Sequence, residues 1–260
     1  MLKGKCAVVT GSTSGIGLGI ARALAGEGCN LMINGFGDAS AIEAERARLA
    51  EEFGVTVAYN GGDLSKGDEC AALIADSEAR LGAVDILVNN AGIQHTDPVD
   101  RFPPERWEAI IALNLSSAFH TLHAALPRMK ERAYGRVINI ASVHGLVASA
   151  NKSAYVAAKH GLIGLTKVVA LENAESGITC NAICPGWVLT PLVERQIDAR
   201  AAARSIPFAQ ASRELLEEKQ PSKRFTTVEQ LGALVVFLCS DGAANMTGAA
   251  LTVDGGWTAQ

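Results

Sequence analysis

A glycine-rich turn between an apolar strand and a helix constrains the fold of this chain more than any other feature. The turn reads Thr10-Gly11-Ser12-Thr13-Ser14-Gly15-Ile16-Gly17, after the apolar run 6–9 and before the apolar segment 18–24. In this context, glycines let backbone N–H groups approach a pyrophosphate at a helix N-terminus. The spacing is Gly-x-x-x-Gly-x-Gly rather than Gly-x-Gly-x-x-Gly, so a tight turn without a ligand is the alternative. We predict a nucleotide-binding α/β fold.

Apolar and β-branched runs alternate with helical segments along the whole chain, without an internal repeat. This alternation predicts a doubly wound, mostly parallel seven-stranded sheet of the Rossmann-like type, with ligands at the carboxyl ends of the strands. Ser40 and Thr227 begin predicted capping boxes, and Pro103-Pro104 begins a third helix. The predicted strands lie near 5–10, 29–34, 55–60, 84–89, 135–140, 178–184 and 249–253.

The composition is that of a single-domain enzyme over residues 1–260. A hydrophobic content of 48% is ample for one core of this size. By our reading of the sequence, no apolar stretch approaches the length of about 18 residues that a membrane span needs, and the N-terminus enters the first strand without a signal peptide. A net charge of −4 argues against a nucleic-acid partner. We expect a cytoplasmic protein with neither a nucleic-acid nor a membrane partner.

Six cysteines are spread along the chain without a Cys/His cluster of ligand spacing. Cys180 and Cys184 lie along one predicted strand, where they alternate with other residues. Buried free thiols are the expected state, and we predict neither a disulfide nor a metal site. The six positions are 6, 29, 70, 180, 184 and 239.

Ser142, Tyr155 and Lys159 carry the chemistry. If residues 152–171 form a helix, Tyr155 and Lys159 lie on one face a single turn apart. Lowering a tyrosine pKa from about 10 to about 7 requires roughly 4 kcal/mol. One ammonium at about 4 Å supplies roughly that amount at an effective dielectric near 20. We therefore expect Lys159 to activate Tyr155 as a general base, although a lone Tyr-x-x-x-Lys is usually an ordinary surface helix.

Further motifs surround these residues in a specific order. They are Asp63, Asn89-Asn90-Ala91-Gly92, Asn114 and Pro185-Gly186. With the turn and the Ser-Tyr-Lys set, the chain resembles the classical short-chain dehydrogenase/reductase family over essentially its whole length. The resemblance implies that Ser142 holds the substrate oxygen, Tyr155 moves the proton and Lys159 also binds ribose. It further implies that Asn114 holds a water that links Lys159 to solvent.

The turn and the resemblance together define an expected cofactor site. Its residues are Gly11, Thr13, Gly15, Ile16, Gly17, Asp63, Leu64, Asn90, Ala91, Gly92, Tyr155, Lys159, Pro185, Gly186, Val188 and Thr190. The second strand ends in Asn34-Gly35-Phe36-Gly37-Asp38, and neither this stretch nor the turn has an Arg or Lys for a 2′-phosphate. NAD is thus favoured over NADP. The usual ribose-binding carboxylate is missing from the strand end, so we expect Phe36 or the backbone to line the ribose, with Asp38 as an outside candidate.

Polar residues and tryptophans near the catalytic set predict a small substrate pocket. They are Gln94, His144, Lys152, Trp187, Gln196 and Trp257. Lys152, Gln94 and His144 are suited to hold a carboxylate, and the tryptophans to exclude water. Singly, each has a plainer explanation, as a solvated helix start, a loop residue or core. Within the family, the resemblance implies reversible oxidation of (R)-3-hydroxybutyrate to acetoacetate, with residues 187–222 as a lid.

Two alternative functions stay open. One is NADP-dependent reduction of a 3-oxoacyl thioester, carried by coenzyme A or acyl carrier protein. Such a substrate calls for basic residues at the cleft mouth and a cofactor-side arginine, and neither is evident in the sequence. The other is an NAD-binding protein without turnover, which would have no need of Ser142 and Tyr155.

The segment 152–171 is apolar almost all round, whereas a helix lying on a sheet needs one apolar stripe. Its outer face should therefore be covered. We predict a subunit interface there, with the 104–132 helix as a neighbour, and the resemblance implies a homotetramer.

Overall fold

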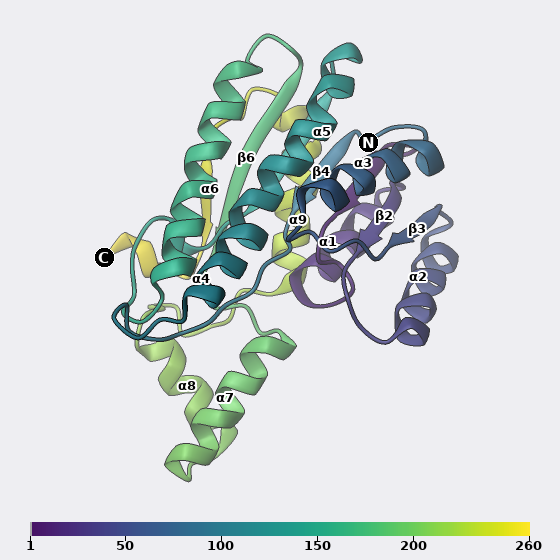
Figure 1. Cartoon of the computed structure of the whole chain (residues 1–260). Helices are drawn as coiled ribbons and strands as arrows, with labels where there is room; N and C mark the ends of the chain where they lie inside the picture. The colour runs from purple at the N-terminus through teal and green to yellow at the C-terminus, as the bar shows by residue number, and fades with distance from the viewer. Residues whose placement is uncertain (1) are drawn as a thin grey trace.

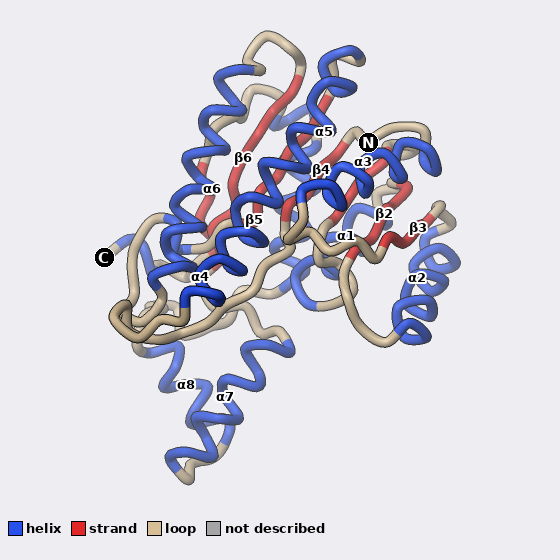
Figure 2. The backbone as a smooth tube through the Cα atoms, viewed as in Figure 1, coloured by secondary structure: helices blue, strands red, loops and turns tan. Residues whose placement is uncertain are grey.

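A seven-stranded parallel sheet forms the centre of the protein, in the order β3-β2-β1-β4-β5-β6-β7. The computed structural model describes residues 2–260. Figure 2 shows the strands between helices on both sides, as the sequence predicts. The strands are β1 (Cys6–Val9), β2 (Asn30–Asn34), β3 (Val57–Asn60), β4 (Ile86–Asn89), β5 (Gly135–Ile140), β6 (Ile178–Pro185) and β7 (Ala250–Val253).

Helices cover both faces of the sheet (Figure 1). They are α1 (Gly15–Gly26), α2 (Ala39–Phe53), α3 (Gly67–Leu81), α4 (Pro104–Ile111), α5 (Ser117–Glu131), α6 (Ser153–Glu172), α7 (Pro191–Arg204), α8 (Phe208–Glu217) and α9 (Val228–Cys239). Alternate strand residues point to opposite faces. Val9 thus packs in a cluster with α1, α2 and α9, while Val8 packs in a second cluster with α3, α5 and α6.

The predicted strands agree with the observed ones to within two residues, and two of the three predicted helix starts are confirmed. Thr227 caps α9 in a capping box with Gln230, and Pro104 is the first residue of α4. The prediction for Ser40 is wrong. Asp38 is the N-cap of α2, because its carboxylate accepts a hydrogen bond from the Ala41 amide at 2.9 Å.

A π-helical turn, Ala112–Ser116, joins α4 to α5, and it contains Asn114.

The combined helix Pro104–Glu131 and α6 are both long and apolar enough to cross a membrane, by length and composition alone. The expectation that no stretch reaches this limit is therefore wrong. Core helices of soluble proteins pass the same test, and residues of both helices pack in the clusters on the sheet.

Helices α7 and α8 form a hairpin that projects from the body of the protein (Figure 1). It has a small core of its own, in which Val193 and Ile197 of α7 pack with Leu215 of α8. Ion pairs Arg200–Glu218 and Arg204–Glu214 add to this contact. At its base, the Trp187 amide donates to Gln220 Oε1 at 3.0 Å, and the Thr226 amide donates to the Trp187 carbonyl at 2.9 Å. The hairpin is thus a compact unit on a fixed base.

The outer face of α6 is apolar and exposed in the single chain. Val168 is 50% exposed and Leu171 is 78% exposed. Its inner face shares a core cluster with α5 through Ala118, Leu162 and Ile163.

All six cysteines are buried free thiols, as predicted.

Candidate active site

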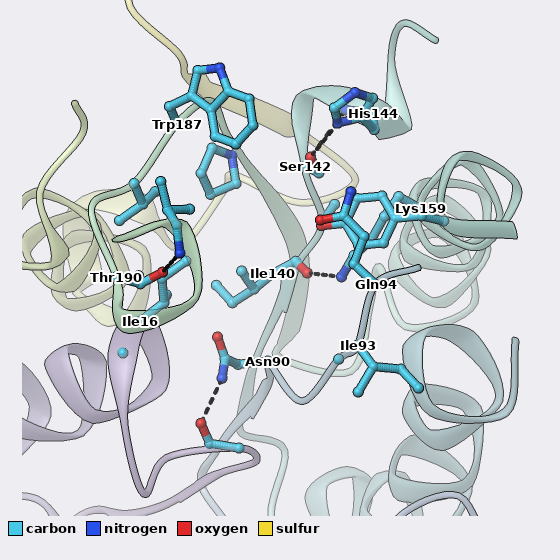
Figure 3. A pocket seen from close by; sticks show the side chains of 18 of the residues that line it. Ile16, Asn90, Ile93, Gln94, Ile140, Ser142, His144, Lys159, Trp187 and Thr190 are labelled. Atoms are coloured by element: carbon cyan, nitrogen blue, oxygen red, sulfur yellow. Dashed lines mark hydrogen bonds between the residues drawn. The ribbon is translucent and has the colours of Figure 1, made fainter. Parts of the chain in front are cut away.

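A cleft of about 380 Å³ opens at the carboxyl ends of β1, β4, β5 and β6 (Figure 3). The elements α1, α6 and α7 complete its walls. The structure brings most of the predicted site residues to it. These are Gly11, Gly15, Ile16, Gly17, Asn90, Ala91, Gly92, Gln94, Ser142, His144, Lys152, Tyr155, Lys159, Pro185, Gly186, Trp187, Val188, Thr190 and Trp257.

The glycine turn at one end of the cleft is too tightly packed for side chains. A Cβ atom on Gly17 would lie 2.3 Å from the Gly11 carbonyl oxygen. Gly11 and Gly15 have φ angles of +61° and +56°, which favour glycine. Ser14, the N-cap of α1, makes no side-chain capping bond, so the first amides of the helix are left for another acceptor. The turn fits the pyrophosphate of a dinucleotide at this helix N-terminus.

Hydrogen bonds fix the turn to the neighbouring strand ends. Thr10 Oγ1 accepts from the amides of Asn90 and Ala91 at 2.9 and 3.0 Å. The Asn90 side-chain amide donates to the carbonyl oxygens of Thr10 and Gly11. The ends of β1 and β4 are therefore held together where a ligand would cross them.

Lys159 is a buried cation at the floor of the cleft. Its Nζ donates to the Ile140 carbonyl oxygen at 2.7 Å, and burial lowers its pKa to about 8. Nζ lies 5.6 Å from the centroid of the Tyr155 ring. A desolvated ammonium of this kind favours the approach of an anion or of hydroxyl oxygens.

Tyr155 differs from the prediction in one respect. Burial raises its pKa, and the hydrogen bond with Ser142 lowers it by a smaller amount. The expectation that Lys159 by itself lowers this pKa to about 7 is wrong, because the lysine is directed to Ile140 rather than to the phenol. Tyr155 is thus protonated at neutral pH when only these residues act on it.

His144 and two tryptophans form the opposite end of the cleft. The His144 ring makes edge contacts with Tyr155 and Trp257, at centroid distances of 5.9 and 5.5 Å. Burial lowers the His144 pKa to about 4, and the charge of Lys152 acts in the same direction. The ring is therefore neutral at physiological pH.

Lys152 precedes α6 and lies over the Trp187 ring, with Nζ 5.4 Å from the centroid. Burial lowers the Lys152 pKa. Within residues 2–260, no carboxylate forms an ion pair with it or lines the cleft. This end of the cleft is suited to a small anion.

Some predicted residues lie outside the cleft. Leu64 is buried in the core, Phe36 is 67% exposed, and Thr13 Oγ1 donates to the Phe36 carbonyl oxygen. Asp63 binds the amide and hydroxyl of Ser65. These residues lie around the ends of β2 and β3, where an extended dinucleotide would reach beyond the cleft.

Asn114 and Gln196 also do not line the cleft. The Asn114 amide group exchanges two hydrogen bonds, each 2.9 Å, with the backbone of Ile93, which is a cleft residue. Gln196 is exposed on α7.

Arg195 lines the cleft and was missed from the sequence. It follows Pro191 by four residues on α7, and both line the cleft, so helical spacing was the available signal. Ser14, Ile93, Ile140, Ala141, Val143, Pro191 and Val193 were also missed. Most of them line the cleft with backbone or apolar atoms, and no motif in the sequence identifies such residues.

Comparisons with known proteins agree with this site. A family model described as enoyl-(acyl carrier protein) reductase matches residues 11–258. The chain is 60% identical over 260 residues to a D-beta-hydroxybutyrate dehydrogenase of Cupriavidus necator, and the match covers 100% of both chains. The chain belongs to the short-chain dehydrogenase/reductase family. As a member, it is an oxidoreductase that uses a nicotinamide cofactor.

Two further members of the family extend the comparison. A D-beta-hydroxybutyrate dehydrogenase of Rhizobium meliloti is 54% identical over 256 residues, covering 98% of this chain and 99% of the relative. The crystal structure of levodione reductase superposes with a TM-score of 0.90 at 32% identity, covering 99% of this chain and 98% of that one. The predicted fold class is thereby confirmed.

Proposed function

We propose that the protein catalyses the reversible, NAD-dependent oxidation of (R)-3-hydroxybutyrate to acetoacetate. The observation that carries this proposal is Lys152, a largely buried cation beside Trp187 in the same cleft as Tyr155. A carboxylate a short distance from the reacting carbon would neutralise it, and Trp187 and Trp257 restrict the space to a small acid. Full-length similarity to two D-beta-hydroxybutyrate dehydrogenases supports the same substrate, and the (R) configuration follows from that similarity.

In the oxidation, Ser142 and Tyr155 hold the substrate hydroxyl group. Tyr155 takes the hydroxyl proton while the hydrogen on the same carbon leaves with its electron pair. A nicotinamide held in the cleft would supply the hydride acceptor, and the positive charge of its oxidised form would favour the phenolate form of Tyr155. In the reverse direction Tyr155 returns the proton to the carbonyl oxygen.

Lys159 and Asn114 support this proton transfer. Lys159 lines the same cleft, and its ammonium would favour the phenolate once the substrate and cofactor are bound and would bind ribose hydroxyl groups. Asn114 lies in a π-helical turn, and its side chain makes two hydrogen bonds with the backbone of Ile93. Such turns occur often at functional sites. We assign Asn114 the family's role of holding a water beside Lys159.

NAD is proposed over NADP because of the residues around the end of β2. Thr13 binds the Phe36 carbonyl and Asp38 caps α2, so this region is occupied by neutral and acidic groups. Arg22 pairs with Glu45 and Glu52, and Arg46 pairs with Glu43. A 2′-phosphate would find no free cation there among the described residues.

Arg195 extends the cofactor site proposed from the sequence. It lies on α7 and lines the cleft. The N-cap of this helix, Thr190, lies close to the glycine turn, because its Cγ2 atom would be 3.7 Å from a Cβ atom added to Gly15. Three other arginines of α7 and α8 form ion pairs with Glu218, Glu214 and Glu217, whereas Arg195 has no such partner within residues 2–260. We assign Arg195 to the cofactor pyrophosphate.

The segment 187–222 is the proposed lid. The α7–α8 hairpin has its own core and a fixed base, so it can move as one body. Closure would bring Gln196 toward the substrate and Arg195 onto the pyrophosphate.

We also propose that the protein is a cytoplasmic homotetramer. The exposed apolar face of α6 supports the assembly.

The main rival is a 3-oxoacyl thioester reductase. The argument against it from the sequence is weakened, because Arg195 does supply a basic residue in the cleft. What favours the small acid is the end of the cleft lined by the contacting rings of His144, Trp187 and Trp257. Lys152 lies over Trp187 there, and a thioester would bring no anion to it.

The test is NADH formation by purified protein given (R)- or (S)-3-hydroxybutyrate, each with NAD and with NADP. Turnover confined to the (R) acid with NAD is expected. Activity only with NADPH and acetoacetyl-CoA would overturn the substrate and cofactor, and leave the fold standing. Cofactor binding without turnover of any of these substrates would favour the non-catalytic alternative.

A further inference from the structure

The chain enters the helix α6 through a residue in an uncommon backbone conformation. Asn151 has a φ angle of +65°, in the left-handed region that few residues other than glycine adopt. It directly precedes Lys152, the N-cap of α6, whose carbonyl oxygen accepts the Val156 amide at 2.9 Å. The change of chain direction at Asn151 therefore lies next to the cation that the proposed function assigns to the substrate carboxylate.

The side chain of Asn151 makes no contact that would explain an asparagine at this position. It is exposed, and none of the hydrogen bonds within residues 2–260 involves its carboxamide group. Glycine adopts the left-handed region freely, and asparagine adopts it more readily than most residues that have a Cβ atom. The residue type at position 151 thus matches the backbone conformation.

The backbone of Asn151 is joined to the loop that carries Gln94. The Asn151 carbonyl oxygen accepts the Asp97 amide at 2.9 Å, and Asp97 forms a parallel bridge with Lys152. Gln94, three residues before Asp97, lines the same cleft as Lys152 (Figure 3). Two side chains suited to bind a carboxylate are therefore connected through the carbonyl group of Asn151.

No carboxylate within residues 2–260 holds the Lys152 ammonium in the cleft. Its Nζ lies 5.4 Å from the centroid of the Trp187 ring, and burial lowers its pKa. Desolvation by itself would favour a conformation in which the ammonium reaches water. The backbone at Asn151 opposes that movement, because it sets the direction in which the Lys152 side chain leaves the chain.

We propose that Asn151 is a positioning residue whose left-handed backbone directs Lys152 into the cleft, toward the substrate carboxylate. The inference rests on the proposed function, in which Lys152 binds that carboxylate. Asn151 itself is exposed and does not line the cleft. Its effect on the reaction therefore passes through the direction of Lys152.

Asn151→Val introduces a β-branched residue, for which the left-handed region is strongly unfavourable. The fraction of molecules that hold Lys152 in the cleft should fall, and KM for 3-hydroxybutyrate should rise about tenfold at saturating NAD. We expect kcat and the Kd for NADH to stay within about twofold of wild type, because the carboxylate is bound in the ground state and the transition state alike. An unchanged KM would contradict the proposal.

Asn151→Gly removes the same side chain and keeps the backbone conformation accessible. We expect KM within about twofold of wild type, since glycine adopts a positive φ without strain. A KM that rises as much in Asn151→Gly as in Asn151→Val would show that the carboxamide group, rather than the backbone conformation, is what matters. That result would overturn the proposal.

A matched control for strain alone is Ala133→Val. Ala133 is also exposed and has a φ angle of +50°, but it precedes β5 at the end of that strand away from the cleft. We expect this variant to have a lower free energy of unfolding in urea and the KM of wild type. An equal rise in KM in the two valine variants would assign the effect to general loss of stability, against the proposal.

Lys152→Ala separates an effect through Lys152 from an effect elsewhere. In the double variant Asn151→Val/Lys152→Ala, we expect KM to match that of Lys152→Ala within about twofold, because the side chain to be directed is no longer present. A further large rise in KM would mean that Asn151 acts on another part of the site, and would contradict the inference.

The pKa of Lys152 provides a measurement that needs no substrate. Carbon NMR of protein labelled at lysine measures it, with Lys152→Ala to identify the signal. We expect a value below the ordinary 10.5 in wild type and a return toward 10.5 in Asn151→Val, as the ammonium reaches water. That return without turnover of 3-hydroxybutyrate would support the positioning of Lys152 and overturn the proposed substrate. An unchanged pKa in Asn151→Val, with turnover of the acid, would overturn the inference alone.

Discussion

Single residues in the cleft carry positive charge that no carboxylate among residues 2–260 neutralises. Lys152 and Lys159 both have lowered pKa values because burial removes water without supplying a carboxylate. Two such cations stabilise anionic groups brought by ligands, at a cost to the free protein. Lys152 and Lys159 therefore favour ligands that carry negative charge.

Tyr155→Phe removes the proton donor and acceptor and retains the ring. We expect kcat to fall by about a thousandfold or more, since general acid–base catalysis contributes on this scale. The Kd for NADH, from fluorescence titration, should change by less than about twofold. Substantial remaining turnover would contradict the assignment of Tyr155.

Lys152→Ala removes a cation that binds the substrate carboxylate in the ground state and in the transition state alike. We expect KM for 3-hydroxybutyrate to rise more than kcat falls, in steady-state assays at saturating NAD. An unchanged KM would move the carboxylate site elsewhere. Lys167→Ala, on the exposed side of α6, is the control.

His144→Gln tests the energetic cost of keeping an imidazole neutral. The folded pKa of about 4 is below the ordinary value of 6.5, so between these pH values the unfolded chain binds a proton that the folded protein does not. Stability is thus lost as pH falls from 6.5 to 4, by about 3 kcal/mol at most from this group. The free energy of unfolding in urea should depend less on pH in the variant. Equal pH dependence would show that the ring is not kept neutral.

At the scale of elements, α7 and α8 add a unit with its own core to an otherwise continuous α/β fold. Its base is held by Gly186, Trp187 and Gln220, and a Cβ atom on Gly186 would lie 2.7 Å from Gln220 Oε1. Between the fixed base and the separate core, the hairpin presents Arg195 to the cleft. The residues that line the cleft therefore come both from the strand ends and from the hairpin.

Arg195→Gln should weaken cofactor binding. We expect the Kd values for NADH and for ADP-ribose to rise by a similar factor of about ten, because both carry the pyrophosphate and a charge-assisted hydrogen bond is lost. Arg200→Gln makes the same exchange on the same helix at a residue paired with Glu218, and should have a smaller effect. A rise only in KM for acetoacetate would assign Arg195 to the substrate.

For the whole molecule, the apolar outer surface of α6 is the feature that a single chain leaves unexplained. Phe119 of α5 is a further large apolar side chain that is 51% exposed. Burying such surface on assembly is favourable at about 25 cal/mol per Å². The cleft is lined by residues of this chain, and assembly would stabilise the sheet and helices that position them.

Leu171→Glu places a charge in this apolar surface. We expect the assembly to dissociate at micromolar concentration, because the charge would be buried without a partner. Sedimentation velocity measures the change. Phe208→Glu, the same kind of exchange on the projecting hairpin, should not alter the oligomer. A wild-type monomer at this concentration would end the homotetramer proposal.

The sequence by itself determined the order of strands and helices, the glycine turn and the spacing of Ser142, Tyr155 and Lys159. Those features depend on local periodicity and on steric limits at glycine, which adjacent residues reveal. Even there, Asp38 rather than Ser40 caps α2, since nearby residues compete for the same amides.

Only the tertiary structure decided the pKa values of the site residues and which residues line the cleft. The pKa of Tyr155 is raised because surrounding elements exclude water from it, and Lys159 is directed to the Ile140 carbonyl. Arg195 lies in the cleft while its neighbour Gln196 lies outside, because the direction of α7 selects one side of that helix. Desolvation and helix orientation depend on every element packed around a residue, and adjacent sequence does not contain that information.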